Sequence, residues 1–206
     1  MKFQNSIGLA VIIVVNIIGV IGFNSESLLP LFKTLTPYNQ LLTLLICFFY
    51  LPVKKFIFPF IVLFSTGYGV EILGVKTGWL FGNYNYGVTL GTPIFDVPLI
   101  MGVNWFILII GTRACANWFT KNIILQILVS AIIMVGLDFL IEPIAIDYDF
   151  WNWHQPEVPK QNYLMWFIVS IFMQSLITKK SSLIPYSLGF TIVASQLIFF
   201  GALLIS

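Results

Sequence analysis

The chain has 206 residues, of which 59% are hydrophobic and 9% are charged, and its formal net charge is +2. Its mean hydropathy of +0.97 exceeds what a soluble domain of this size requires, so the composition indicates an integral membrane protein. The small, dispersed charge gives no indication of nucleic-acid binding. The two cysteines form no CxxC or zinc spacing, and a single histidine argues against a histidine-built metal site, so no metal is expected.

Seven apolar segments approach the roughly 17–25 residues that a helix needs to cross a bilayer. They cover residues 4–22, 38–53, 56–73, 98–114, 122–141, 162–178 and 184–205. The first follows Lys2 as a signal peptide would, but no A-x-A-like site occurs in the following "GFNSESLLP", so we interpret it as a retained transmembrane helix. The sequence therefore predicts an all-α, polytopic membrane bundle of about seven transmembrane helices, forming a single domain over residues 1–206.

The basic residues divide unequally between the two sides of this arrangement. One side carries Lys2, Lys54, Lys55, Arg113, Lys121, Lys179 and Lys180. The other side carries Lys33, Lys76 and Lys160. Because positive charge favours the cytoplasmic side, we predict a protein of the cell (inner) membrane with a cytoplasmic N-terminus and an outer C-terminus. All the acids lie on the outer side or at its helix ends, where charge near the apolar core is costly.

Two long connections on the outer side are rich in aromatic residues. The first, "GVKTGWLFGNYNYGVTLGTPIFDVP", has too many glycines for a continuous helix and too many aromatics for a solvated linker. The second, "PIAIDYDFWNWHQPEVPKQNY", is also aromatic and is interrupted by prolines. We predict irregular segments that lie in the membrane interface and together cover one pocket. The alternative is a belt that only anchors the protein at the lipid headgroups.

Three acids at this side form the main candidate site. Asp138 and Glu142 are four residues apart and share a helix face if the helix continues to Glu142, although Pro143 biases that residue away from helical geometry. Like charges, the negative end of the helix dipole and a low dielectric all disfavour ionisation there, which favours a protonated acid able to donate its proton. Glu71 could join them from a neighbouring helix; alternatively, it pairs with Lys76.

A buried acid of this kind suits the protonation of an isoprenoid double bond, the commonest reactive group among apolar molecules in a bilayer. Protonation gives a tertiary carbocation, which aromatic faces stabilise through cation–π attraction. The aromatic candidates on this side are Trp79, Tyr84, Tyr86, Trp105, Trp151, Trp153 and Trp166. The cation then either loses a proton or captures water. The sequence has no dinucleotide, haem or flavin motif, so no redox cofactor is expected.

Two blocks of sequence resemble the membrane carotenoid biosynthesis protein family, which includes the carotenoid 1,2-hydratases and the bisanhydrobacterioruberin hydratases. "EILGVKTGWLFGNYNYGVTLG" is similar to the family's E-x-x-G-x-x-T-G-x-x-F-G-x-Y-x-Y segment. "DFLIEPIA", "FWNW" and "PKQNYLMW" are similar to its second block, with two acids four apart, W-x-W and P-x-x-N-Y-x-x-W. The blocks extend from Glu71 to Trp166, nearly half of the chain.

The resemblance implies a cofactor-independent hydro-lyase that adds water across the terminal double bond of a linear end group on a linear or monocyclic carotenoid, leaving a tertiary alcohol. The acids that match the family's motifs are Glu71, Asp138 and Glu142, and Tyr84, Tyr86 and Asn162 also match motif positions. We expect Asp138 to donate the proton, with Glu142 or Glu71 positioning the water. Asp96 departs from the family, which usually has a small residue there, and ranks below the other acids.

Other functions compete with this interpretation. A carotenoid cyclase shares the protonation step, and a non-catalytic assembly factor for other carotenoid enzymes would need no acid. D-x-x-x-E loosely suggests a magnesium-dependent prenyltransferase, but the outer side has few bases to bind a diphosphate. A retinal protein would need a lysine in its last helix, which is absent. For a transporter, the inner halves of the helices carry only Asn16, Gln174 and Gln196, which we expect to form interhelical hydrogen bonds.

Overall fold

The computed structural model describes residues 4–206. Lys2, which contributed to the predicted orientation, lies outside the described residues. The helices are α1 (Gln4–Phe23), α2 (Leu29–Tyr50), α3 (Val53–Thr77), α4 (Ile100–Phe119), α5 (Ile123–Asp147), α6 (Lys160–Leu176), the 3-10 helix η1 (Thr178–Leu183) and α7 (Tyr186–Leu204). The strands are β1 (Tyr84–Tyr86), β2 (Pro93–Ile94), β3 (Val97–Pro98) and β4 (Trp151–Trp153). Among the described residues, five helices are long and apolar enough to cross a membrane, namely α1, α3, α4, α5 and α7.

The helices follow the predicted segments, and the largest differences are at the start of α2 and the end of α5. α2 begins at Leu29 rather than at residue 38, because Pro30 occupies a first-turn position, where its fixed φ favours a helix. α5 continues through Pro143 to Asp147 instead of ending at residue 141. Glu142 therefore remains helical and shares a face with Asp138. α3 is capped by Gly78, whose φ of 67° is a left-handed conformation that glycine adopts without strain.

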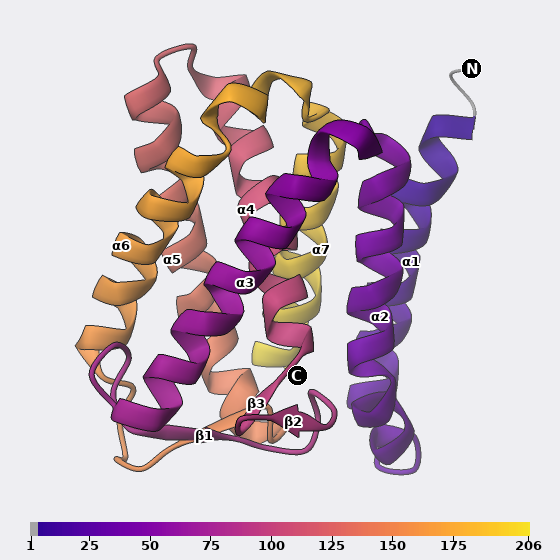
Figure 1. Cartoon of the computed structure of the whole chain (residues 1–206). Coiled ribbons are helices and arrows are strands. Elements are labelled where there is room, and N and C mark those ends of the chain that lie inside the picture. The colour runs from indigo at the N-terminus through magenta and orange to yellow at the C-terminus, as the bar shows by residue number, and fades with distance from the viewer. Residues whose placement is uncertain (1–3) are drawn as a thin grey trace.

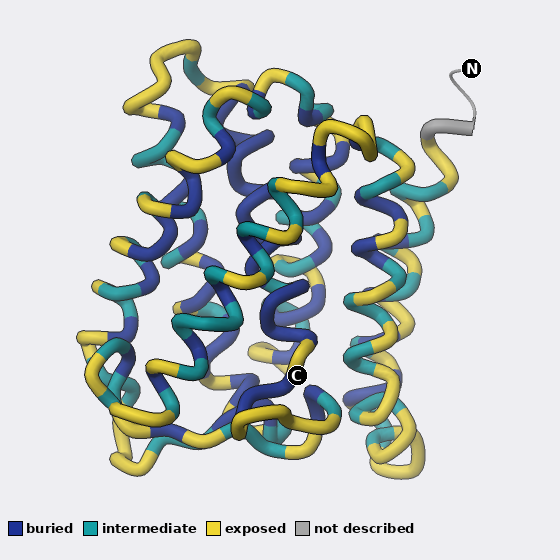
Figure 2. Tube along the Cα trace, viewed as in Figure 1, coloured by how far each residue is buried: buried dark blue, intermediate teal, exposed yellow. Residues whose placement is uncertain are grey.

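α4 is the central helix of the bundle. It packs against α2, α3, α5, α6 and α7, and Figure 2 shows it almost entirely buried. From Ile100 to Asn117 every residue is buried except Asn104, which is partly accessible. α1 and α2 pack against each other and lie at one side of the bundle (Figure 1). The five helices that pack against α4 thus share one hydrophobic core with it.

The two ends of the bundle differ. The start of α1 and the α2–α3, α4–α5 and α6–α7 connections lie at one end (Figure 1). We call it the basic end because it carries Lys54, Lys55 and Lys121. The strands and the α1–α2 connection lie at the other end (Figure 1), which we call the ribbon end. Arg113 does not reach the surface of the basic end: it is buried in α4, and its Nη2 donates to Thr178 Oγ1 at 3.0 Å.

The sequence predicted that the two long connections at the ribbon end are irregular. Instead, each contributes one strand to an antiparallel pair. β1 and β4 are antiparallel, with Tyr84 opposite Trp153 and Tyr86 opposite Trp151. Because strand side chains alternate between faces, these four aromatic residues share one face of the pair. We call β1 and β4 together the aromatic ribbon. The connection to α4 also folds back on itself through the antiparallel pair β2–β3.

Candidate active site

Close packing brings the aromatic ribbon against the end of α3. Gly74 lies one turn after Glu71, and a Cβ added at Gly74 would come within 2.6 Å of the Phe81 ring and 2.8 Å of Tyr84 Oη. Only glycine therefore allows the two aromatic side chains to approach the helix this closely. The Y-x-Y strand is consequently placed directly over Glu71.

Glu71 is buried and accepts three hydrogen bonds. Its Oε2 atom accepts from the hydroxyls of Tyr84 and Tyr86, both at 2.6 Å, and its Oε1 atom accepts from Trp105 Nε1 at 2.8 Å. Burial, followed by the charge of Glu71, raises the pKa of both tyrosine hydroxyls well above its usual value. Both hydroxyls therefore keep their protons and remain donors at any physiological pH.

Glu142 is held by the other strand of the ribbon. Its Oε2 atom accepts from Trp153 Nε1 at 2.8 Å and from Trp151 Nε1 at 3.0 Å. An indole N–H can only donate, so this oxygen must act as an acceptor. The W-x-W spacing puts both indoles on one face of β4, which explains how residues two apart reach a single oxygen.

Asn162, in the first turn of α6, joins the two acids of α5. Its Nδ2 donates to Asp138 Oδ2 at 2.8 Å and to Glu142 Oε1 at 3.0 Å, which uses both of its hydrogens. Asp138 is fully buried, and its Oδ1 has no hydrogen-bond partner within the described part of the chain. It is the one carboxylate oxygen of the three acids that lacks a donor among residues 4–206.

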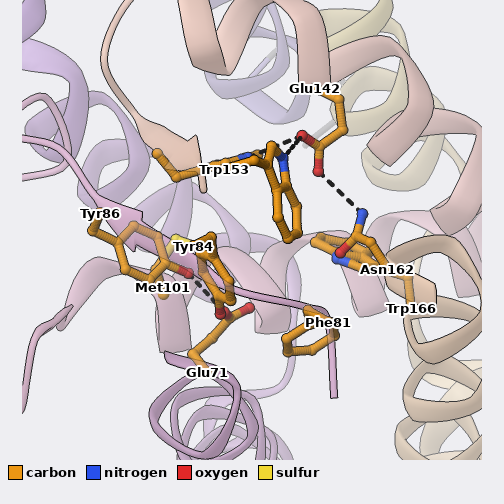
Figure 3. A pocket seen from close by; sticks show the side chains of 10 residues that line it. Glu71, Phe81, Tyr84, Tyr86, Met101, Glu142, Trp153, Asn162 and Trp166 are labelled. Carbon is orange, nitrogen blue, oxygen red and sulfur yellow. Dashed lines mark hydrogen bonds between the residues drawn. The ribbon is translucent and has the colours of Figure 1, made fainter. Parts of the chain in front are cut away.

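A small cavity lies between these groups (Figure 3). It is lined by Glu71, Phe81, Tyr84, Tyr86, Met101, Glu142, Trp151, Trp153, Asn162 and Trp166. Glu71 and Glu142 lie on opposite sides of the labelled aromatic rings (Figure 3). The volume open to the centres of water-sized molecules is about 20 Å³, which is enough for a water molecule. Within the described residues, no group of three or more His, Cys, Asp or Glu side chains is placed to hold a metal ion.

Comparison with known proteins assigns the chain to a family. The model of the family described as carotenoid biosynthesis protein matches residues 35–203. The chain belongs to this family. It is 29% identical over 168 residues to the bisanhydrobacterioruberin hydratase of Haloarcula japonica, an alignment that covers 70% of this chain and 55% of that protein. The chain thus spans about half the length of this curated relative. No solved structure matches the chain.

The motif residues that suggested the carotenoid biosynthesis family come together in three dimensions. Eight of the ten predicted site residues line the cavity: Glu71, Tyr84, Tyr86, Glu142, Trp151, Trp153, Asn162 and Trp166. The other two lie just behind its lining. Trp105 donates to Glu71 and stacks on Trp166, with ring centroids 4.5 Å apart. Asp138 lies behind Asn162.

The structure also separates some residues from the site and adds others. Trp79 is 82% exposed and does not line the cavity. Lys76 pairs with Asp96, so the alternative pairing of Lys76 with Glu71 is wrong. Sequence reasoning missed Phe81 and Met101 as lining residues. Phe81 belongs to the F-G-x-Y-x-Y motif and could have been included, whereas Met101 reaches the cavity only because α4 is central.

Proposed function

We propose that this protein is a carotenoid hydratase that adds water to the terminal double bond of a linear carotenoid end group. The observation that carries the proposal is a buried trio of acids beneath aromatic rings, in which only Asp138 Oδ1 lacks a partner among the described residues. Membership of the carotenoid biosynthesis family and the relative named as a bisanhydrobacterioruberin hydratase support the choice of substrate class and of reaction.

In the proposed reaction, Asp138 is the proton donor. Its Oδ1 lacks a donor of its own, whereas each oxygen of Glu71 and Glu142 accepts at least one hydrogen bond. A carboxyl proton is therefore accommodated at Asp138 Oδ1 without displacing a hydrogen bond. When the cavity widens enough for the alkene to reach Asp138 past Asn162, the proton passes to the less substituted alkene carbon. The π electrons form the new C–H bond, leaving a tertiary cation and the Asp138 carboxylate.

Glu71 and Glu142 stabilise that cation and position the water that captures it. Both line the cavity and are held by neutral donors, so their negative charge is oriented before the reaction begins. The indole faces of Trp153 and Trp166 add cation–π attraction. A water molecule adds through its oxygen to the cation, and the proton that it gives up returns to the Asp138 carboxylate. The net change is one water per double bond, and the acids return to their starting state.

The cavity must widen to admit a substrate, because about 20 Å³ suffices for water but not for an isoprenoid end group. We infer that the aromatic ribbon moves, since its two strands belong to connections between helices rather than to the helices themselves. Such a movement would bring the end group under Trp151 and Trp153 and beside Asn162.

For the membrane, we propose that all seven α-helices cross the bilayer, with the basic end in the cytoplasm and the ribbon end at the outer face of the cell membrane. The described lysines support this orientation, since Lys54, Lys55, Lys121, Lys179 and Lys180 belong to the basic end. Three lysines belong to the ribbon end, and one of them, Lys76, is neutralised by Asp96.

Pigment analysis tests the proposed function. The chain is expressed in a host that accumulates a linear or monocyclic carotene, and the extract is examined by mass spectrometry. We expect a product heavier by one water, absent with Asp138→Asn and present with the matched surface variant Asp96→Asn. An isomer of unchanged mass that absorbs at shorter wavelength would indicate a cyclase instead. Equal pigment with the wild-type chain and Asp138→Asn would indicate an assembly factor.

A further inference from the structure

A second cavity lies beside the acid site, between α1, α2, α4 and α7. Its polar lining consists of Asn16, Asn39, Gln40, Thr43, Asn104 and Gln196, which we call the amide cluster. The volume open to water-sized molecules is about 50 Å³. The two cavities share Met101, Trp151 and Trp166 as lining residues. These three side chains therefore border both the amide cluster and the acid site.

The amide cluster has hydrogen-bonding atoms that the protein leaves unused. Asn39 Oδ1 and Gln40 Oε1 are buried and find no partner among residues 4–206. Asn16 Nδ2 donates to Ile12 O at 2.8 Å, and Thr43 Oγ1 donates to Asn39 O at 3.0 Å, both within their own helices. An unsatisfied buried polar atom costs about 1–3 kcal/mol. Asn39 and Gln40 differ from the other unpartnered groups of the bundle in that both line one polar cavity, where a bound molecule would satisfy both oxygens.

Gln174 is an amide of the same bundle that joins two helices through its Nε2 donor, although its Oε1 also has no partner among residues 4–206. Its Nε2 donates from α6 to Ile109 O and to Thr112 Oγ1 of α4, at 3.2 and 3.0 Å. This confirms the predicted interhelical role for Gln174, whereas the hydrogen bond of Asn16 stays within α1. The hydrogen bonds that Asn16 and Thr43 donate thus do not join helices as those of Gln174 do.

The chemistry of the amide cluster identifies its ligand. Amide and hydroxyl groups both donate and accept, and no lining residue of this cavity carries a charge. A polyene would leave the amides unsatisfied, and an ion would lack a counter-charge. Water satisfies both kinds of group, and a polar cavity of about 50 Å³ has room for a few water molecules. We propose that the amide cluster binds the water that is consumed in the hydration, an inference that rests on the proposed function.

This role has a specific consequence for the reaction. If water is withheld, Asp138 still protonates the alkene, but the cation can return only by losing a proton from a neighbouring carbon. In deuterated water the acid carries deuterium, so the carotene that is recovered gains deuterium without gaining oxygen. The ratio of alcohol to deuterated carotene thus measures water supply, and it does not depend on how much folded protein each variant gives.

The test uses Asn39→Leu and Gln40→Met, which keep side-chain size and remove the amides, in membranes supplied with a linear carotene in deuterated water. We expect the ratio of alcohol to deuterated carotene to fall roughly threefold to tenfold, the factor that one lost hydrogen bond of ordinary strength gives. The matched control Gln174→Met should leave the ratio unchanged even where it lowers protein yield.

Three results would overturn the inference. An unchanged ratio in both variants would show that the amides do not supply water. A parallel loss of alcohol and of deuterated carotene would assign them a structural or substrate-binding role. A wild-type protein that gives neither product would overturn the hydratase proposal and this inference with it, and so differs from a failure of the amide cluster alone.

Discussion

Removing one of the two tyrosine hydroxyls that donate to Glu71 measures how strongly the aromatic ribbon is fixed to α3. In Tyr84→Phe the ring stays in place, while the 2.6 Å hydrogen bond to Glu71 Oε2 is lost. Solvent cannot replace this hydrogen bond, because Tyr84 and Glu71 are only 5% and 3% exposed. Tyr86 still donates to the same oxygen, so the carboxylate is left partly satisfied.

The size of the effect follows from the kind of bond. A hydrogen bond to a charged group contributes about 1.5–3 kcal/mol, against about 0.5–1.5 kcal/mol for a neutral pair. In a chain of this length 1 kcal/mol corresponds to about 2–4 °C in Tm, so we expect Tyr84→Phe to lower Tm by roughly 3–12 °C. Thermal unfolding of the purified protein in detergent, followed by tryptophan fluorescence, measures this directly.

Tyr38→Phe is the matched control, because Tyr38 is 62% exposed on α2 and the same hydroxyl is removed. We expect its Tm to stay within about 2 °C of the wild type, as for most surface substitutions. If Tyr84→Phe behaves like Tyr38→Phe, the contact between ribbon and α3 contributes no measurable stability, and the reasoning from Glu71 is refuted.

Three further predictions concern other parts of the site. Asn162→Leu removes the donor shared by Asp138 and Glu142, so two buried acceptors lose a partner. Denaturant titration should show a free energy of unfolding lower by about 2–6 kcal/mol. A loss below about 1 kcal/mol would contradict the shared hydrogen bonds. Gly78→Val, at φ 67°, should cost about 1–2 kcal/mol by the same assay, and an unchanged stability would mean that α3 can end without a left-handed residue. The wild-type Tm should fall as pH rises above about 10, the usual pKa of tyrosine, because burial raises the pKa of the Tyr84 hydroxyl and only the unfolded chain then ionises. The fall should be shallower in Tyr84→Phe, and an identical pH profile in both proteins would contradict the raised pKa.

The sequence predicted the helical part of the fold well because apolar length is a strong signal for a membrane helix. It failed where a local rule met tertiary packing. Pro143 suggested that a helix ends near Glu142, yet α5 continues to Asp147. The start of α2 was missed because residues 29–37 are less apolar than the rest of the helix and include Pro30 and Pro37.

The aromatic ribbon was predictable in part. Y-x-Y and W-x-W each have the alternation of a strand, and both were noticed as family motifs, but their pairing joins segments far apart in the chain and has no local signature. The same holds for the donors to Glu142, since nothing in the sequence says that Trp151 and Trp153 reach one oxygen.

Most of the amide cluster could not be predicted from the sequence. Asn16 and Gln196 stood out as polar residues within apolar segments, but Asn39, Gln40 and Asn104 did not, because each lies near the start of a predicted helix, where a polar residue is ordinary. Only the packing of α1, α2, α4 and α7 brings these side chains into one cavity.

The most direct test of the hydration chemistry is to follow the oxygen. Purified protein is incubated with a linear carotene in water labelled with heavy oxygen, and the carotenoid product is analysed by mass spectrometry. Our account predicts a tertiary alcohol that carries the label from water, formed by the wild-type chain and not by Asp138→Asn. An alcohol with unlabelled oxygen, or an isomer that contains no added oxygen, would contradict the capture of water by a protonated carotenoid.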